Sequence, residues 1–137
     1  MGEGLSLYLD ASALVKRYVA EEGSDALIGA MREAEGWAIC RVGYVETART
    51  VGLAAGKGAV KKFSADWPSF EVVEVDGSLA EHATELTSTE ELRSLDALHL
   101  AAALLIVSPE LTFATWDVRL HGAAQRQGLA VFPAELR

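Results

Sequence analysis

The sequence has little cysteine, no long apolar segment and few basic residues, and each shortage excludes a class of protein. Its single cysteine, Cys40, cannot form a disulfide within the chain, which rules out a disulfide-stapled scaffold. The longest apolar run, Leu100 to Val107, is far shorter than the roughly 20 residues of a membrane-spanning helix. With 12 Lys and Arg against 20 Asp and Glu, the net charge of −8 excludes a broad basic surface for nucleic acid.

The chain is well supplied with the apolar side chains that a folded core needs. Hydrophobic residues make up 50% of its 137 residues and charged residues 23%, which excludes a disordered or fibrous protein. This length predicts a single domain over residues 1–137. The amino-terminal residues show no basic segment followed by a long apolar one, so we expect no secretion signal, no membrane association and a cytoplasmic location.

Short apolar segments alternate with segments of helical periodicity along the whole chain. The predicted strands cover residues 5–9, 37–40, 71–75, 111–115 and 129–132. The predicted helices cover residues 11–19, 26–35, 42–55, 59–66, 78–86, 93–107 and 117–127. This alternation predicts an α/β fold: a three-layer α/β/α sandwich around a mostly parallel sheet of about five strands. Sites in such folds form beyond the carboxyl ends of the strands.

Four acidic residues fall at or near that edge of the predicted sheet. Asp10 directly follows the first strand, and Asp117 lies just beyond the fourth. Glu46 lies one turn into the helix after the second strand, and Asp96 opens the most apolar helix. Taken singly, each aspartate could be a helix cap and Glu46 a solvated surface residue. Separate caps do not explain why all four acids share one edge.

Carboxylates that converge repel one another unless a cation lies between them. An all-oxygen donor set selects Mg²⁺ or Mn²⁺, and such a site can activate water while binding a phosphate oxygen. The chemistry predicted is metal-dependent phosphodiester hydrolysis. The three histidines and Cys40 lack the spacing of a zinc site, and His99 is interpreted as a helix residue near the core.

Four short motifs resemble those of PIN-domain ribonucleases, most closely the toxins of VapBC toxin–antitoxin modules. They are Leu-Asp-Ala-Ser-Ala-Leu-Val-Lys-Arg-Tyr at 9–18, Tyr-Val-Glu at 44–46, Leu-Asp-Ala-Leu-His-Leu-Ala at 95–101 and Thr-Trp-Asp-Val-Arg-Leu at 115–120. Each motif is weak alone, but four in this order and spacing are fairly specific. The similarity spans nearly the whole chain.

The resemblance implies a role for each acid and for two neighbouring hydroxyl residues. Asp10, Glu46, Asp96 and Asp117 would bind Mg²⁺ or Mn²⁺ and carry out RNA cleavage. Ser12 and Thr115 would hydrogen-bond to these ligands or to metal-bound water; the alternative for both is local bonding to the backbone at a helix start.

The resemblance also implies partners. Toxins of this kind form homodimers and are inhibited by a cognate VapB-type antitoxin. The antitoxin often places an arginine against the acids, which is a direct electrostatic block.

An acidic protein needs local features to hold RNA. A bound metal and a rim of basic residues near the acids would serve, and Arg93, Arg17 and Arg119 are the candidates for substrate binding. The alternative for each is a solvated position on a helix face. Trp116 is bulky for its place in the motif and is expected to pack there or to stack on a base.

Two other functions are compatible with the same residues. The chain could be a catalytically silent PIN-like scaffold, or its acids could act on DNA instead of RNA. A phosphoaspartate enzyme is disfavoured because Ser12 stands where such an enzyme needs a second aspartate, and the sequence has no glycine-rich phosphate loop.

Overall fold

A five-stranded parallel sheet forms the centre of the molecule. The computed structural model describes residues 5–106, 108 and 110–137, so Met1–Gly4 and Val107 of the predictions lie outside the described residues. The strands are β1 (Ser6–Leu9), β2 (Gly36–Cys40), β3 (Phe70–Val73), β4 (Leu111–Ala114) and β5 (Ala130–Phe132). Their order is β3-β2-β1-β4-β5 and every neighbouring pair is parallel, which confirms the predicted sheet.

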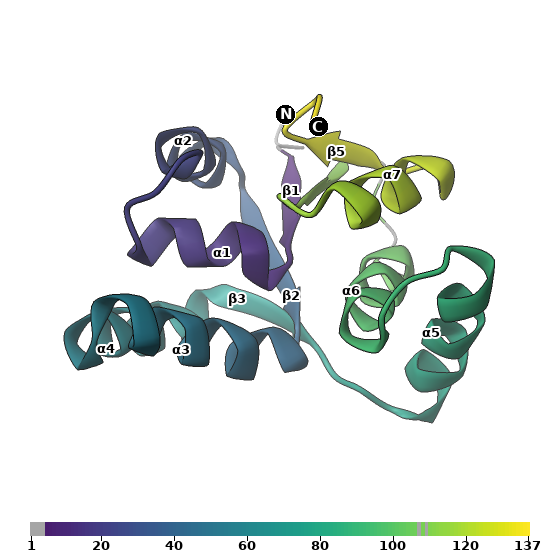
Figure 1. Cartoon of the computed structure of the whole chain (residues 1–137), viewed down its shortest axis with the longest axis horizontal. Helices are drawn as coiled ribbons and strands as arrows, with labels where there is room; N and C mark the ends of the chain where they lie inside the picture. Colours follow the sequence, from purple (N-terminus) through teal and green to yellow (C-terminus); the bar gives the residue numbers. More distant parts are fainter. Residues whose placement is uncertain (1–4, 107, 109) are drawn as a thin grey trace.

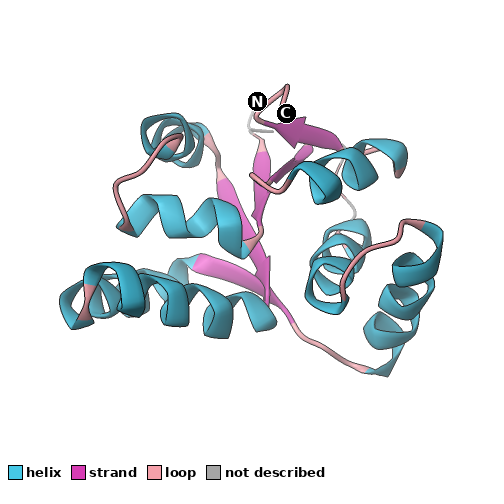
Figure 2. Cartoon of the chain, viewed as in Figure 1, coloured by secondary structure: helices cyan, strands magenta, loops and turns pink. Residues whose placement is uncertain are grey.

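Helices cover both faces of this sheet, which confirms the predicted three-layer sandwich (Figures 1 and 2). One face carries α1 (Ala11–Tyr18), α2 (Ser24–Glu33), α3 (Val42–Ala55) and α4 (Lys57–Asp66). The other carries α5 (Gly77–Thr89), α6 (Ser94–Leu105) and α7 (Val118–Arg126). A single 3₁₀ turn, Trp67–Ser69, joins α4 to β3. Among the described residues, no helix is long and apolar enough to cross a membrane.

The central strand β1 shows why the sheet is buried on both sides. Successive side chains of a strand point to opposite faces. Leu7 and Leu9 therefore pack under α1 and α2, whereas Tyr8 packs against α6 with its ring stacked on Phe113 at 5.2 Å between centroids. The exposure of these three side chains is 4% or less. A parallel strand covered in this way accounts for the short apolar runs in the sequence.

The chain turns directly from strand to helix at the carboxyl edge of the sheet. Asp10 ends β1 and caps α1 by accepting a hydrogen bond from the Ala13 backbone N–H at 2.9 Å. Asp117 follows β4 and caps α7 in the same way, through the N–H of Leu120. Because β1 pairs with β4 in parallel, Asp10 and Asp117 lie beyond the carboxyl ends of two adjacent strands, at the same edge of the sheet.

Candidate active site

Asp10 is a buried carboxylate at the centre of the carboxyl edge. Its exposure is only 3%, and both of its oxygens accept hydrogen bonds. Oδ1 accepts from Ser12 Oγ at 2.7 Å and from the Ala13 N–H, and Oδ2 accepts from Thr115 Oγ1. Burial raises the pKa of Asp10, which means that loss of hydration outweighs these hydrogen bonds. The described residues provide no Lys or Arg ion pair to this carboxylate.

Ser12 and Thr115 join Asp10 to the segment that carries Asp117. Ser12 Oγ accepts from the Trp116 N–H at 2.9 Å, and Thr115 Oγ1 accepts from the Asp117 N–H at 3.0 Å. Each hydroxyl therefore contacts Asp10 and a backbone N–H at once. The backbone contact is local for Thr115 but not for Ser12, so the alternative of local bonding applies to Thr115 alone. The result is a rigid connection between the ends of β1 and β4.

Asp96 and Asp117 share a single arginine. Arg93 places Nε 3.4 Å from Asp96 Oδ2 and Nη2 3.6 Å from Asp117 Oδ2, although its side chain is 80% exposed. Burial, followed by the charge of Asp117, raises the pKa of Asp96. Unlike Asp10 and Asp117, Asp96 is not a helix cap, because Arg93 is the cap residue of α6 and Asp96 lies in the first turn of that helix. A capping role therefore does not account for a carboxylate at this position.

Glu46 contacts a buried histidine and is only partly exposed to solvent. Its Oε1 lies 2.7 Å from Nε2 of His99, whose other ring nitrogen lies 2.7 Å from the hydroxyl of Tyr8. His99 is 1% exposed, so it lies in the core of α6 as predicted, but with both nitrogens engaged. Glu46 is thus a partly exposed residue with a buried histidine as its partner, rather than a fully solvated one.

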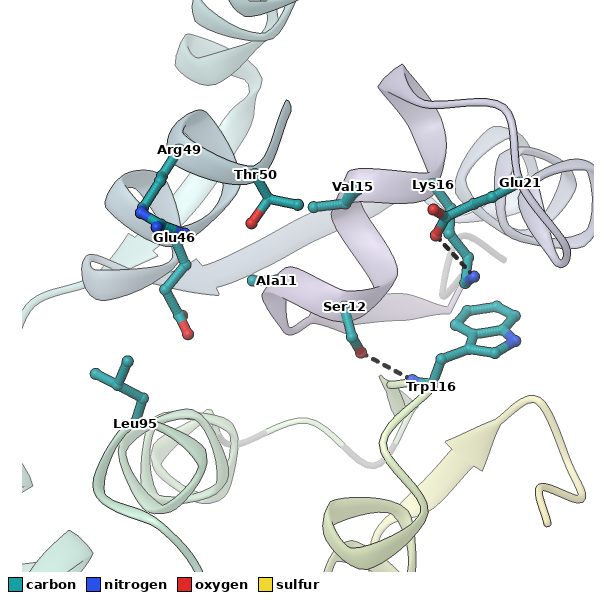
Figure 3. A pocket seen from close by; sticks show the side chains of 10 residues that line it. All are labelled: Ala11, Ser12, Val15, Lys16, Glu21, Glu46, Arg49, Thr50, Leu95 and Trp116. Carbon is teal, nitrogen blue, oxygen red and sulfur yellow. Dashed lines mark hydrogen bonds and ion pairs between the residues drawn. The ribbon is translucent and has the colours of Figure 1, made fainter. Parts of the chain in front are cut away.

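A pocket of about 500 Å³ opens beside Glu46 (Figure 3). Its walls come from α1, α3, the start of α6 and the loop after β4. They include Ser12, Lys16, Arg49, Leu95 and Trp116. A second cavity of about 290 Å³ is lined by Arg93, Asp96, Asp117 and Arg119. The edge of the sheet thus offers concave surfaces lined by both carboxylates and cations.

The predicted basic residues are divided between this edge and other surfaces. Arg93 and Arg119 lie with Asp96 and Asp117. Arg17 does not: its Nε lies 3.3 Å from Asp66 Oδ2, and its guanidinium lies over Trp37, 5.1 Å from the ring centroid. The ion pair and the aromatic contact hold Arg17 on the side of α4, so the structure does not bring it together with the acids.

Trp116 packs within the protein, as one of its two predicted roles requires. Lys16 Nζ lies over the ring, 5.0 Å from its centroid, and Phe132 meets it edge to face. Gly23 lies against the same ring with φ of +92°, and a Cβ there would lie 2.9 Å from Trp116 Nε1. Both the left-handed backbone and the close approach require glycine at that position.

The donor chemistry of the four acids fits a hard divalent cation. All four contribute oxygen ligands only, Asp10 is buried with a raised pKa, and Asp96 and Asp117 converge on one cation. Within the described part of the chain, however, no group of three or more His, Cys, Asp or Glu side chains is arranged to hold a metal ion. The oxygen chemistry of the four side chains suits Mg²⁺ or Mn²⁺. In this structure Arg93 and His99 engage three of the acids.

Sequence reasoning missed the chain of contacts from Glu46 through His99 to Tyr8. The signal was available: His99 follows Asp96 by three residues and therefore shares its helix face. A histidine on such an apolar helix needs polar partners. The sequence does not show which residues from other elements supply them.

Comparison with known proteins identifies the family to which this fold belongs. The PIN domain family pattern matches residues 7–115. Ribonuclease VapC49 of Mycobacterium tuberculosis is 33% identical over 139 residues, which cover 95% of this chain and 96% of that protein. The chain therefore belongs to the PIN-domain family, in its VapC group, and the family resemblance found in the sequence is confirmed.

Solved structures share the same fold. The crystal structure of Mycobacterium tuberculosis VapC20, described as a sarcin-ricin-loop-cleaving toxin, superposes with a TM-score of 0.74 at 16% identity. The match covers 90% of this chain and 96% of that one. A toxin–antitoxin complex from Klebsiella pneumoniae gives 0.71 at 16% identity, covering 96% and 99%.

Proposed function

We propose that this protein is a metal-dependent endoribonuclease, the toxin of a VapBC-type pair, which hydrolyses RNA phosphodiester bonds. The observation that carries the proposal is the placement of Asp10, Asp96, Asp117 and Glu46 around one edge of a parallel sheet. The names of its curated relatives, which are VapC ribonucleases, support the same activity.

The four carboxylates would hold Mg²⁺ or Mn²⁺. The metal, when bound, supplies an activated water and a positive charge opposite the scissile phosphate. Thr115 and Ser12 keep the Asp10 carboxylate in one orientation, and Arg93 and Arg119 provide positive charge beside Asp96 and Asp117 for the RNA backbone. Burial of Asp10 keeps bulk water away from its two carboxylate oxygens.

The proposed partners are a cognate VapB-type antitoxin, an RNA substrate and a second copy of this chain. The Klebsiella pneumoniae structure with the same fold is a toxin–antitoxin complex, and VapC20 is described as a sarcin-ricin-loop-cleaving toxin. Apolar side chains are exposed close to the acids: Leu95 is 45% exposed at the pocket and Val45, next to Glu46, is 68% exposed. Such side chains suit a partner segment that covers the pocket.

Calorimetric titration with Mn²⁺, followed by cleavage assays, tests the proposal. The unsubstituted protein should bind Mn²⁺ and cleave single-stranded RNA, and Asp96→Asn should do neither while keeping its circular dichroism spectrum. A DNA strand of the same sequence separates a ribonuclease from a DNA-directed nuclease. A folded protein without metal binding or cleavage would contradict the proposal and favour a scaffold.

A further inference from the structure

The contact between Glu46 and His99 belongs to a chain of polar groups that joins four elements, β2, β1, α6 and α3. The Cys40 backbone N–H of β2 donates to Tyr8 Oη at 3.0 Å, and Tyr8 Oη lies 2.7 Å from His99 Nδ1. His99 Nε2 lies 2.7 Å from Glu46 Oε1. Tyr8 is fully buried and His99 is 1% exposed, so every proton in this chain needs a partner within it.

Counting donors and acceptors selects one tautomer for His99. Tyr8 is neutral because burial, the largest of several influences, raises its pKa well above the ordinary value. Its hydroxyl proton therefore needs an acceptor, and among the described residues the acceptor within hydrogen-bonding distance is His99 Nδ1. Nδ1 then carries no proton, and in neutral imidazole the proton lies on Nε2, facing Glu46.

The other two states leave a buried group without a partner. If Nδ1 carried the proton, the Tyr8 hydroxyl would have no acceptor, and the bare Nε2 would face a carboxylate oxygen at 2.7 Å. If both nitrogens carried protons, the Tyr8 proton would again be stranded. Only the Nε2–H tautomer satisfies Tyr8, His99 and Glu46 together.

We propose that His99 is a positioning residue: Tyr8 fixes it as the Nε2–H tautomer, and it holds one oxygen of Glu46 so that the other serves the pocket. In the described structure Oε2 of Glu46 accepts no hydrogen bond, and Glu46 lines the pocket of Figure 3. The side chain is 24% exposed, so it is accessible to a ligand from that side. Carboxylates that bind metals are commonly oriented by such a second hydrogen bond.

Packing around the contact supports an orienting role. Gly43 lies one turn before Glu46 on α3, and a Cβ there would overlap the Ile39 side chain and lie 3.2 Å from His99 Cε1. The absence of a side chain at Gly43 lets α3 approach α6 closely enough for the Glu46 carboxylate to reach the imidazole. Both partners are thus held by buried surroundings rather than by a flexible surface contact.

The first test is the ¹⁵N NMR spectrum of the histidine side chains in the metal-free, unsubstituted protein near neutral pH. We expect His99 to show a protonated Nε2 and an unprotonated, hydrogen-bonded Nδ1. A protonated Nδ1, alone or in an imidazolium, would overturn the inference. The spectrum of His99→Gln assigns the signals among the three histidines, and the test does not depend on whether the protein cleaves RNA.

The second test compares two amide replacements. In His99→Gln the amide NH₂ can occupy the place of Nε2–H, whereas the shorter His99→Asn reaches only the position of Nδ1. We expect His99→Asn to bind Mn²⁺ and cleave single-stranded RNA about 10–100-fold less well, and His99→Gln to recover most of both. Equal values for His99→Asn and the unsubstituted protein would refute the positioning role.

The inference that His99 positions Glu46 rests on the proposed function, in which Glu46 takes part in RNA cleavage. The variant Glu46→Gln distinguishes a failure of the proposed role of Glu46 from a failure of the inference about His99. If Glu46→Gln cleaves as well as the unsubstituted protein, the proposed role of Glu46 fails, whatever the tautomer of His99. If Glu46→Gln is inactive but His99→Asn is fully active, the inference about His99 fails and the proposed function stands. The NMR test observes the tautomer in the unsubstituted protein and uses His99→Gln only to assign the signals, so loss of activity in a variant does not protect the inference.

Discussion

Thr115 and Asp10 are joined by a buried hydrogen bond across 105 residues of sequence, the hydroxyl of one donating to Oδ2 of the other. Thr115 is completely buried, and its oxygen also accepts from the Asp117 N–H. One hydroxyl therefore fixes both the orientation of an acid on β1 and the path of the chain toward the acid that begins α7.

Removal of that hydroxyl should weaken both stability and activity. In Thr115→Val the shape is kept, but Asp10 Oδ2 and the Asp117 N–H each lose a partner. We expect a loss of about 1–3 kcal/mol in the free energy of unfolding, measured with urea, because a buried acceptor is left unsatisfied. RNA cleavage should fall about 10–100-fold. Thr115→Ser keeps the hydroxyl and should lie close to the unsubstituted protein; an equally damaged Ser variant would point to lost methyl packing instead.

Ionised Asp96 should destabilise the metal-free fold at neutral pH. Its pKa is raised in the folded protein by burial and by Asp117, so the folded state holds the proton more tightly than the unfolded chain does. That stabilisation is complete below the unfolded pKa and disappears as the pH rises through the folded pKa. Asp96→Asn should therefore have the larger free energy of unfolding at about pH 7, by a margin that shrinks toward about pH 4.

The measurement for Asp96 is urea unfolding in EDTA over that pH range. Glu33→Gln, which removes one exposed negative charge at the end of α2, is the control for net charge. If both variants gain the same stability, the effect arises from overall charge and not from the acidic edge.

Gly43→Ala should disrupt the contact between α3 and the centre of the molecule. The added Cβ would overlap Ile39 and press on His99, both buried, and overpacking of this kind costs about 1–3 kcal/mol. Gly29→Ala is the matched control: Gly29 lies in α2 with nothing within 4 Å of its added Cβ, and the same change should stabilise by about 0.5–1 kcal/mol. Thermal and urea unfolding of both variants check the difference in sign.

Arg93 should contribute one phosphate contact to RNA binding. In an inactive Glu46→Gln background with Mn²⁺, Arg93→Ala should weaken binding of a labelled single-stranded RNA. It should also reduce the slope of log affinity against log salt by about 0.7, the value for one phosphate of a single strand. Arg32→Ala removes the same charge from the last turn of α2, near the opposite edge of the sheet, and should leave the slope unchanged. An unchanged slope for Arg93→Ala would assign that arginine to the acids alone.

The sheet and most helices could be predicted because their signals are local. Tyr8 in β1 and Ala102 in α6 lie in segments whose apolar period alone indicates the element. Helix ends were harder: α5 begins after Asp76, whose side chain accepts from the Leu79 N–H, and it continues to Thr89, beyond the predicted 78–86. Asp76 and Ser78 are both good caps by type, and only the backbone conformation distinguishes them.

The site was predictable to the extent that topology alone determines position. Asp10 and Asp117 each follow a strand, so parallel pairing of those strands brings them together. Partners that come from other elements leave no local signal: the contact of His99 with Glu46 spans 53 residues, and that of Arg17 with Asp66 spans 49. The contact with Glu46 adds His99 to the residues at this edge. The contact with Asp66 holds Arg17, a predicted substrate-binding residue, away from it.

The position of β1 between β2 and β4 also has a consequence for the newly synthesised chain. Residues emerge from the ribosome in sequence order, and Asp10 and Glu46 precede both Asp96 and Asp117. Until β4 and the start of α7 have emerged, β1 lacks one neighbour, Asp10 lacks Thr115, and Asp117 is not yet present. A chain that ends before residue 115 therefore lacks both Thr115 and Asp117 and cannot complete this edge.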